Sequence, residues 1–260
     1  MAMYDNDNTV KTSFDLSYVS EYLIQAQWAE LIELKKVITE LFRKKQAPIS
    51  IFDIGIGNAR IAKHLSGVPD IWNMVALYDG TDNAAACITI SKQVIAELGI
   101  GDKVHAYLFD ATQLDQWQKK YDLVICTWFT PGNFYPDDFT FNNYQPKEKR
   151  LNLGRNPKFE SIFSKAYQLL HPGGEIVLGA CYLDNNATRL KQEASYKKMG
   201  MTVITDELDS FTATKEGFWS QRFTEEKLYQ YLSFARAENI LIKPLDTYNY
   251  AVQVRVLNTP

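Results

Sequence analysis

Short apolar runs alternate with helical patterns through the middle of the chain, and this alternation is what most limits the folds open to it. Five runs have the composition of buried strands, at residues 48–53, 74–79, 104–109, 122–127 and 175–181. Helical patterns lie between several of them, at residues 59–65, 84–98 and 159–170. Runs that are continuously apolar are typical of parallel strands covered on both faces. We therefore expect a doubly wound α/β fold, with helices on both faces of its sheet.

The segments outside this alternation are predicted to be additions to one core. Apolar residues recur with helical spacing over residues 18–44, which divides the chain into an N-terminal helical cap, 1–45, and one domain, 46–260. Residues 131–157 are longer than an ordinary connection and are interpreted as a lid or acceptor loop. Residues 201–223 are interpreted as an added hairpin or loop. A helix at 224–237 and a strand pair at 240–245 and 251–257 complete the prediction.

Composition excludes several classes of protein. With 46% hydrophobic residues among 260, the chain can build a large core, and its net charge of −3 offers no field for a polyanion. Nucleic acid is therefore disfavoured as the main partner. No apolar run approaches the roughly 20 residues of a membrane span, and the polar start does not resemble a secretion signal. We expect a cytoplasmic protein without a membrane partner; its oligomeric state stays open.

Metal and disulfide chemistry are not indicated. The three cysteines, Cys87, Cys126 and Cys181, lie far apart and form no paired motif. No cluster of histidine and acidic residues has the spacing of a metal site, so no metal is expected. We expect each cysteine to be a small buried hydrophobic residue.

The turn after the first strand is the most informative segment for function. Gly55 and Gly57 follow Asp53 at the end of that strand, and Arg60 stands where a dinucleotide fingerprint has its third glycine. A carboxylate at Asp53 would repel a pyrophosphate but attract a ligand with an amine and a sulfonium. The turn therefore suits a nucleoside without phosphates. The alternative is a tight strand-to-helix turn in which Asp53 binds local backbone amides.

Acidic residues also follow the next two strands. Because the carboxyl ends of parallel strands meet at one edge, these residues should face a common ligand. Asp79, at the end of the apolar run, is preferred for the two hydroxyls of a ribose; Asp82 is the other candidate, and it could equally be the N-cap of the next helix. Asp110 is placed to accept from an adenine amine, or to form a local turn.

This order of motifs resembles the class I S-adenosylmethionine-dependent methyltransferases over residues 49–183. The matching segments are 52–58, Asp79, Asp110, 121–126 and 169–178, although Asn58 stands where many members have glycine, serine or threonine. The resemblance implies a mostly parallel, seven-stranded sheet whose last strand is antiparallel, and S-adenosylmethionine as cofactor. The cofactor-binding residues that it implies are Asp53, Gly55, Gly57, Asn58, Asp79, Gly80, Asp82, Asp110, Ala111 and Thr127.

The acceptor is expected near the end of the fourth strand. Family members that methylate nucleic-acid or glutamine amides often carry Asn-Pro-Pro-Tyr there, whereas this chain has aromatic residues, which bind apolar or cationic groups. Some of these rings are expected only to pack the insertion onto the sheet, and an arginine could clamp a carboxylate. No histidine is placed as a general base, so no catalytic residue is assigned. The expected acceptor-binding residues are Tyr18, Tyr22, Trp128, Phe129, Asn133, Phe134, Tyr135, Arg155, Trp219 and Arg222.

The sequence thus predicts methyl transfer from S-adenosylmethionine to an oxygen or nitrogen atom of a small metabolite or a peptide terminus. Two alternatives remain at this stage. One is an NAD(P)-dependent oxidoreductase, which Asp53 and Arg60 do not favour. The other is an inactive module that binds S-adenosylmethionine without turnover.

Overall fold

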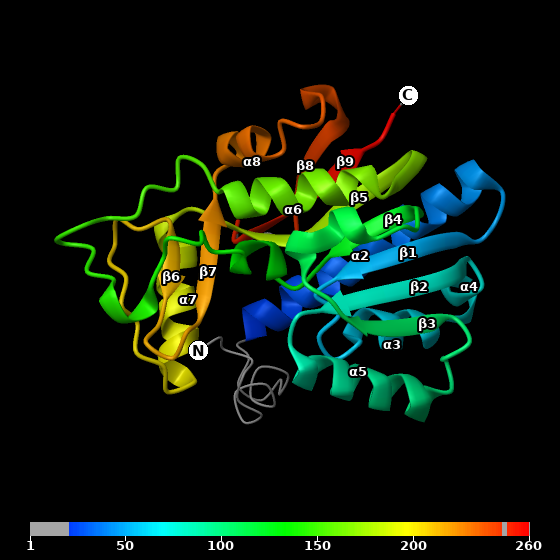
Figure 1. The fold of residues 1–260 in the computed structure, drawn as a ribbon, viewed down its shortest axis with the longest axis horizontal. Coiled ribbons are helices and arrows are strands. Elements are labelled where there is room, and N and C mark those ends of the chain that lie inside the picture. Colours follow the sequence, from blue (N-terminus) through cyan, green and yellow to red (C-terminus); the bar gives the residue numbers. More distant parts are fainter. Residues whose placement is uncertain (1–20, 246–248, 260) are drawn as a thin grey trace.

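The fold is a sheet of parallel strands with helices on both faces (Figure 1). The computed structural model describes residues 21–245 and 249–259. The strands are β1 Ile49–Ile54, β2 Val75–Asp82, β3 Val104–Leu108, β4 Tyr121–Cys126, β5 Leu170–Leu183, β6 Phe211–Ala213, β7 Trp219–Phe223, β8 Ile240–Pro244 and β9 Ala251–Leu257. The α-helices are α2 Glu21–Lys45, α3 Arg60–Ser66, α4 Pro69–Trp72, α5 Ala85–Leu98, α6 Pro157–Gln168, α7 Asn186–Lys198 and α8 Glu225–Tyr231. The 3-10 helices are η3 Ala111–Gln116, η4 Thr130–Asn133, η5 Phe141–Asn143 and η6 Ala237–Asn239.

Strand pairing follows the prediction in the core and extends it at one edge. Strands β3, β2, β1, β4 and β5 are neighbours in that order and run parallel. β9 then pairs antiparallel with β5, and β8 pairs with β9, so the predicted antiparallel last strand and terminal strand pair are confirmed. The end of β5 also pairs with β7, which forms an antiparallel hairpin with β6. This hairpin extends the sheet beyond the seven predicted strands.

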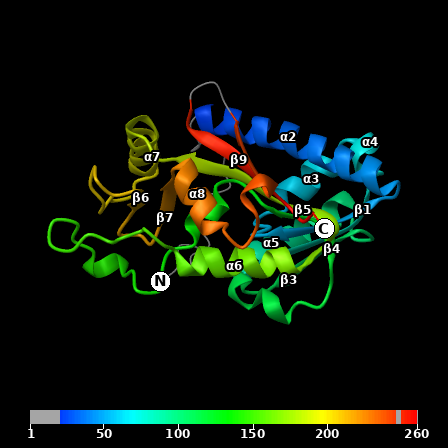
Figure 2. The ribbon, with the colours of Figure 1, turned by 90° about the horizontal axis from the view of Figure 1, so that it is seen from above.

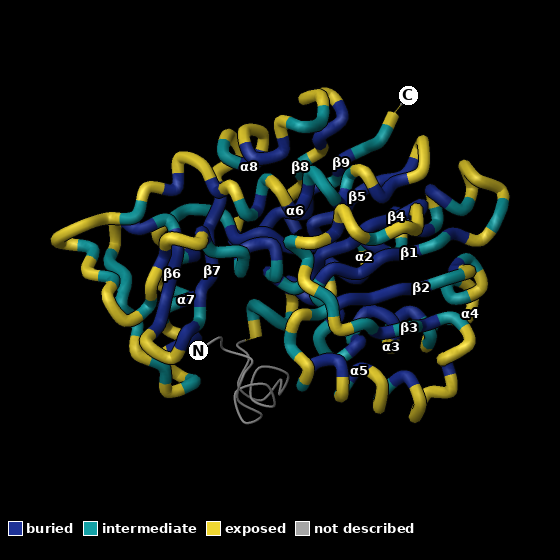
Figure 3. Tube along the Cα trace, in the orientation of Figure 1, coloured by how far each residue is buried: buried dark blue, intermediate teal, exposed yellow. Residues whose placement is uncertain are grey.

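The two faces of the sheet bury separate apolar clusters. On one face, residues of α2, α3 and α5 pack against side chains such as Ile51 and Leu123. On the other, α6 and α8 pack against Phe52 and Val124, the next residues of the same strands. Figure 2 shows α2 and α6 on opposite sides of the sheet, and Figure 3 shows the central strands buried along most of their length. Burial on both faces explains why these strands are apolar at successive positions.

Helix α2 forms one long amphipathic element on the sheet. Leu31, Leu34, Ile38 and Leu41 recur with helical spacing and are buried. Three basic residues in the last turn stabilise the helix, because their charges interact favourably with the negative end of its dipole. The division of the chain into a cap and a domain at residue 45 stays a prediction. No helix within residues 21–245 and 249–259 is long and apolar enough to cross a membrane.

Helix α7 was not predicted, and its composition explains why. Its buried face consists mainly of polar side chains, including Thr188, Gln192 and Ser195, so no apolar stripe marks it as a helix. Asn185 caps its first turn by accepting from the backbone N–H of Thr188 at 2.9 Å. The helix lies beside the β6–β7 hairpin in Figure 1, and Gln192 bonds to Thr212 of β6 at 3.1 Å.

Candidate active site

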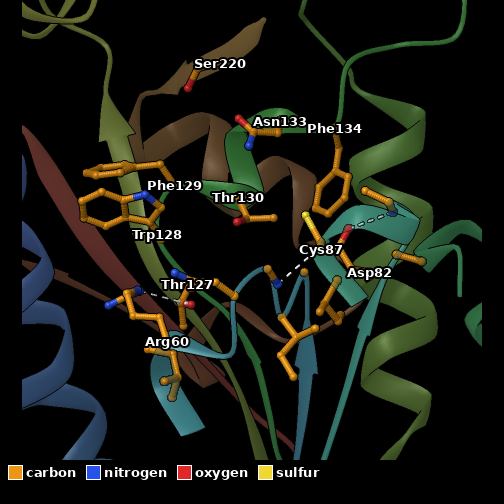
Figure 4. A pocket seen from close by; sticks show the side chains of 18 of the residues that line it. Arg60, Asp82, Cys87, Thr127, Trp128, Phe129, Thr130, Asn133, Phe134 and Ser220 are labelled. Atoms are coloured by element: carbon orange, nitrogen blue, oxygen red, sulfur yellow. Dashed lines mark hydrogen bonds between the residues drawn. The ribbon is translucent and has the colours of Figure 1, made fainter. Parts of the chain in front are cut away.

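The carboxyl ends of four parallel strands open onto one cavity. The turns after β1, β2 and β3 and the segment after β4 line it, together with residues of α2, α3, α5, α6, α7 and the β6–β7 hairpin. Its volume is about 940 Å³, near the upper end of small-ligand sites. In Figure 4, Asp82 and Thr127 lie below Thr130, whereas Asn133 and Ser220 lie above it. Because ligands of open α/β sheets bind at this edge, the cavity is the candidate active site.

The glycine turn after β1 forms part of the cavity wall. Gly55 and Gly57 have φ values of 81° and 56°, which glycine adopts at little cost. The backbone N–H of Gly55 donates to Thr81 O at 2.8 Å, which ties the turn to β2. A Cβ on Gly55 would lie 2.8 Å from Cγ2 of Thr130, so only glycine fits. Gly55, Gly57 and Asn58 line the cavity, and their predicted role toward the cofactor stays a prediction.

The structure places Asp82, and not Asp79, in the lining of the cavity. Strand β2 continues three residues beyond its apolar run and ends at Asp82, which lines the cavity. Its carboxylate accepts from Gly57 N at 3.1 Å and from Ala84 N at 2.9 Å. Burial raises the pKa of Asp82, opposed by these backbone hydrogen bonds. Gly80 does not line the cavity, because its α-carbon packs against the side chain of Ile56.

Asp79 serves the interior instead of the cavity. It is fully buried and accepts hydrogen bonds from Tyr121 Oη at 2.6 Å and Lys119 Nζ at 2.9 Å. His105 Nδ1 lies 3.2 Å away. These contacts join β2, β3 and the start of β4, and they place Asp79 out of reach of a ligand at the strand ends.

Asp53 also lies outside the cavity lining. Tyr78 donates from its hydroxyl to Asp53 Oδ2 at 2.5 Å, and the other oxygen, Oδ1, is buried without a hydrogen-bond partner among the described residues. Burial raises the pKa of Asp53 to about 7, against the lowering effects of Tyr78 and Arg60. Asp53 thus joins β1 to β2 in the interior. Of the three carboxylates expected to face one cleft, Asp53, Asp79 and Asp110, the cavity lining includes Asp110 alone, and Asp82, the alternative to Asp79, is the second carboxylate there.

Asp110 and Ala111 lie at the far end of the same cavity wall. Asp110 caps η3 by accepting at Oδ1 from the N–H and the hydroxyl of Thr112, both at 2.8 Å. The turn-forming role considered for Asp110 is therefore present. Among the described residues, its side-chain hydrogen bonds use Oδ1, which leaves Oδ2 available to a ligand. Phe109 precedes it in the lining and offers an apolar surface.

The segment after β4 has unusual backbone geometry. Trp128 and Phe129 have φ values of 55° and 60°, in the left-handed region that costs a bulky residue about 1–2 kcal/mol. Glu30, fully buried on α2, holds this conformation by accepting from Trp128 N at 2.7 Å. Strained residues held by their surroundings cluster at functional sites. Thr127, predicted for the cofactor, lines the cavity beside them.

Arg60 links this segment to the glycine turn. Its Nη2 donates to Glu30 Oε2 at 2.7 Å and to Thr127 Oγ1 at 3.5 Å, the latter visible in Figure 4. The guanidinium lies 5.2 Å from the centre of the Trp128 ring. Arg60 therefore forms a cavity wall in addition to interrupting the glycine fingerprint.

Most of the predicted aromatic wall is present. Six predicted residues line the upper part of the cavity: Trp128, Phe129, Asn133, Phe134, Tyr135 and Trp219. Phe129 stacks on Tyr182 with ring centres 3.7 Å apart. Other rings of the insertion, including Phe139, pack against Phe211 of the hairpin. The expectation that part of the aromatic set serves packing thus agrees with the structure.

Three predicted acceptor residues lie elsewhere, and a fourth, Tyr18, lies outside the described residues. Tyr22 bonds through its hydroxyl to Ser195 Oγ at 3.0 Å, and it does not line the cavity. Arg155 is exposed and pairs with Glu160. Arg222 is 1% exposed and pairs with Asp184 at 3.1 Å, so it braces the hairpin. Aromatic and basic neighbours in sequence do not reveal which side chains point inward.

Several lining residues were missed. Lys158 lies in the first turn of α6, and Gln192 and Tyr196 lie on α7, far along the chain from the recognised motifs. No sequence pattern marks them, because they meet the cavity only through tertiary packing. Within the described ranges, no group of three or more His, Cys, Asp or Glu residues is arranged to hold a metal ion.

The chain is similar to known proteins in sequence pattern and in fold. A family model described as a methyltransferase domain matches residues 45–236. No curated protein sequence matches the chain.

Solved structures with the same fold cover almost the whole chain. A S-adenosylmethionine-dependent methyltransferase from Clostridium acetobutylicum is 11% identical, with a TM-score of 0.54 over 98% of this chain and 96% of that one. The magnesium protoporphyrin IX methyltransferase of Synechocystis, with bound S-adenosylhomocysteine, is 14% identical, with a TM-score of 0.52 over 98% and 100%. The 1,6-didemethyltoxoflavin-N1-methyltransferase of Burkholderia thailandensis is 12% identical, with a TM-score of 0.52 over 97% and 85%.

Proposed function

The chain belongs to the S-adenosylmethionine-dependent methyltransferases of class I, Rossmann-like fold, and we propose that its acceptor is an oxygen or nitrogen atom of a small organic molecule. One observation carries the proposal: the cavity is continuous from Asp110 to Trp219 and is lined by rings in its upper part. Such a cavity takes a small molecule, or the end of a peptide, more readily than a folded macromolecule. The Burkholderia and Synechocystis enzymes named above also act on small molecules.

The lower part of the cavity is suited to the cofactor, and we assign its residues as a proposal. The turn at Gly55 and Gly57 would hold the methionine end beside Thr127. Asp82, oriented by Gly57 N and Ala84 N, would accept from the ribose hydroxyls. Asp110 Oδ2 would accept from the adenine amine. A site with two carboxylates suits a cationic ligand without phosphates better than a dinucleotide.

The upper part of the cavity would align the acceptor. When bound, S-adenosylmethionine supplies a methyl carbon that is activated by the sulfonium. In-line transfer forms a bond from the acceptor atom to this carbon while the carbon–sulfur bond breaks and sulfur keeps the electron pair. Trp128 and Phe129, fixed at the end of β4, lie where the two ligands would meet and exclude water from the reacting atoms.

Proton removal is not required of the chain in this mechanism. The thiol of Cys87 lines the cofactor part, and burial raises its pKa to about 12, so it stays protonated and is no nucleophile. His64 lines the cavity from α3 beside Trp28, on the side of the glycine turn. An anionic oxygen has no proton to lose, and a neutral nitrogen acceptor would lose its proton to bulk water after the product leaves the cavity.

A labelling experiment tests the acceptor class. The protein would be incubated with S-adenosylmethionine carrying a labelled methyl group and with a cell extract split by ultrafiltration into small molecules and macromolecules. We expect the label in the small-molecule fraction, in a product that mass spectrometry shows to have gained one methyl group. Label confined to protein or nucleic acid would contradict the proposal.

A further inference from the structure

We propose that the acceptor is a planar aromatic molecule with an anionic substituent, and that Lys158 binds this substituent. The inference rests on the proposed function, because it concerns the acceptor half of the same cavity. We define the acceptor half as the part of the cavity that is lined by residues of the segment 128–135, of α6 and α7, and of 217–220, together with Tyr182.

Rings dominate the acceptor half. In Figure 4, Trp128 and Phe129 stand on one side of the cavity and Phe134 on the other, with Asn133 above the gap. Tyr135 and Trp219 lie in the same lining. Aromatic groups prefer offset-stacked or edge-to-face neighbours, and a flat ligand can make both contacts here. The shape and chemistry of this half therefore favour a planar ring over a flexible chain.

The charge of the acceptor half has one sign. The cavity-lining carboxylates among the described residues are Asp82 and Asp110. Both lie in the lower part of the cavity, which we assigned to the cofactor. In the described part of the chain, Lys158 is the charged residue within the acceptor half, and Arg60, which borders this half at the Trp128 ring, is paired with Glu30 at 2.7 Å. An ammonium group on the acceptor would meet no opposite charge there, whereas a carboxylate or an acidic hydroxyl would meet Lys158. The charge pattern thus selects an anion.

Lys158 is held in a position from which it can exchange partners. Its Nζ lies 4.9 Å from the centre of the Tyr135 ring, and the lysine side chain is 21% exposed. It pairs at 2.5 Å with Asp137, whose side chain is 84% exposed. Ion pairs at the surface contribute little to stability, so an anion enclosed by the cavity can replace Asp137.

The helix that carries Lys158 strengthens this preference. Lys158 is the second residue of α6, at the positive end of the helix dipole, where a lysine is unfavourable by itself. Asn156 fixes this end by accepting from Phe159 N at 3.2 Å and by donating to Phe134 O at 2.8 Å. The start of α6 and the aromatic wall are therefore held together. An anion beside Lys158 would interact favourably both with the ammonium group of Lys158 and with the positive end of the helix dipole.

The predicted arginine clamp lacks these properties. Arg155 pairs with Glu160 on the surface, and Arg222 pairs with Asp184 in the interior. Arg150 pairs with Asp206 at 2.6 Å. None of these three arginines lines the cavity.

The test uses three probes with one ring system and different charge: indole-3-acetate, indole-3-acetamide and tryptamine. Each is titrated calorimetrically into the protein saturated with S-adenosylhomocysteine. We expect the acetate to bind roughly tenfold more tightly than the amide, the usual gain of a charge-assisted hydrogen bond, and tryptamine to bind most weakly. Lys158→Met should remove the preference for the acetate and leave the affinity of the amide unchanged, and Lys158→Arg should retain it.

Arg155→Met is the matched control, a nearby cation with a surface partner, and it should behave as the wild type. The proposal is overturned if Lys158→Met keeps the preference, if tryptamine binds best, if Arg155→Met loses the preference, or if no probe binds to the loaded protein. Failure of S-adenosylhomocysteine to bind would instead contradict the proposed function. The charge preference would then be measured with the same probes on the protein alone.

Discussion

The carboxyl group of Asp82 lies at the end of β2, where the ribose of the cofactor would bind. Asp82→Asn keeps the shape of the side chain and removes the charge. The substitution should weaken binding of S-adenosylhomocysteine by about 1.5–3 kcal/mol, the value of a hydrogen bond to a charged group. Isothermal titration calorimetry measures this change directly.

Asp79→Asn is the control for Asp82, three residues earlier on the same strand. Asp79 contacts Tyr121 and Lys119 in the interior, so its substitution should lower the free energy of unfolding and leave cofactor affinity close to that of the wild type. A greater loss of affinity in Asp79→Asn than in Asp82→Asn would restore the assignment that the sequence favoured.

Asp53 predicts a pH dependence of stability. Its folded pKa is about 7, whereas an unfolded aspartate has a pKa of about 3.9. The folded protein therefore binds the proton more tightly, and this contribution is complete below about pH 4 and is lost as the pH rises through about 7. Between about pH 5 and pH 8, the wild type should lose stability relative to Asp53→Asn. Urea unfolding of both proteins across this range measures the difference; parallel curves would show that Asp53 is ionised throughout.

At the scale of elements, the contact of α2 with β5 and the β4 loop depends on a glycine. A Cβ on Gly179 of β5 would collide with the carboxylate of Glu30, which holds Trp128 N and Arg60. Gly179→Ala should therefore destabilise the fold by about 1–3 kcal/mol, the usual cost of overpacking. Thermal or urea unfolding measures this loss.

Gly101→Ala is the matched control for Gly179→Ala, because its Cβ would meet only Ile95 at an ordinary 3.7 Å. It should have little effect on unfolding. Equal losses in the two variants would show that Glu30 can move without cost.

The elements also show what the sequence could and could not predict. The predicted ends of the strands located Gly55, Asp110 and Thr127 correctly at the cavity. This was possible because the apolar runs end where the parallel strands reach the edge of the sheet. The end of β2 was misplaced because its last three residues, held by pairing with β1 and β3, are not apolar. Polar residues can continue a strand whose neighbours supply its hydrogen bonds, and no local pattern records this.

At the scale of the whole molecule, the sheet, its two helical layers and the antiparallel last strand were predictable from the order of buried strands and from the family resemblance. The acceptor half was predictable only in part. Lys158 and α7 line it, and Glu30 holds Trp128 from behind, all through contacts between segments distant in sequence. Such contacts depend on how the insertion and the β6–β7 hairpin pack, and aromatic content alone does not determine that packing.

A cavity built from so many elements should couple cofactor binding to global stability. S-adenosylhomocysteine at a hundred times its dissociation constant should raise the free energy of unfolding by about 2.7 kcal/mol. A thermal shift assay detects this as a rise in Tm, which at the same ligand concentration should be smaller in Asp82→Asn. An unchanged Tm in the wild type would show that the ligand does not bind the folded state.

A crystal structure of the protein with S-adenosylhomocysteine tests the central assignment most directly. The account predicts the ribose hydroxyls at Asp82, the adenine amine at Asp110 and the sulfur atom facing the segment at Trp128 and Phe129. An adenosine bound anywhere else, or a sulfur atom pointing away from the aromatic half of the cavity, would contradict it.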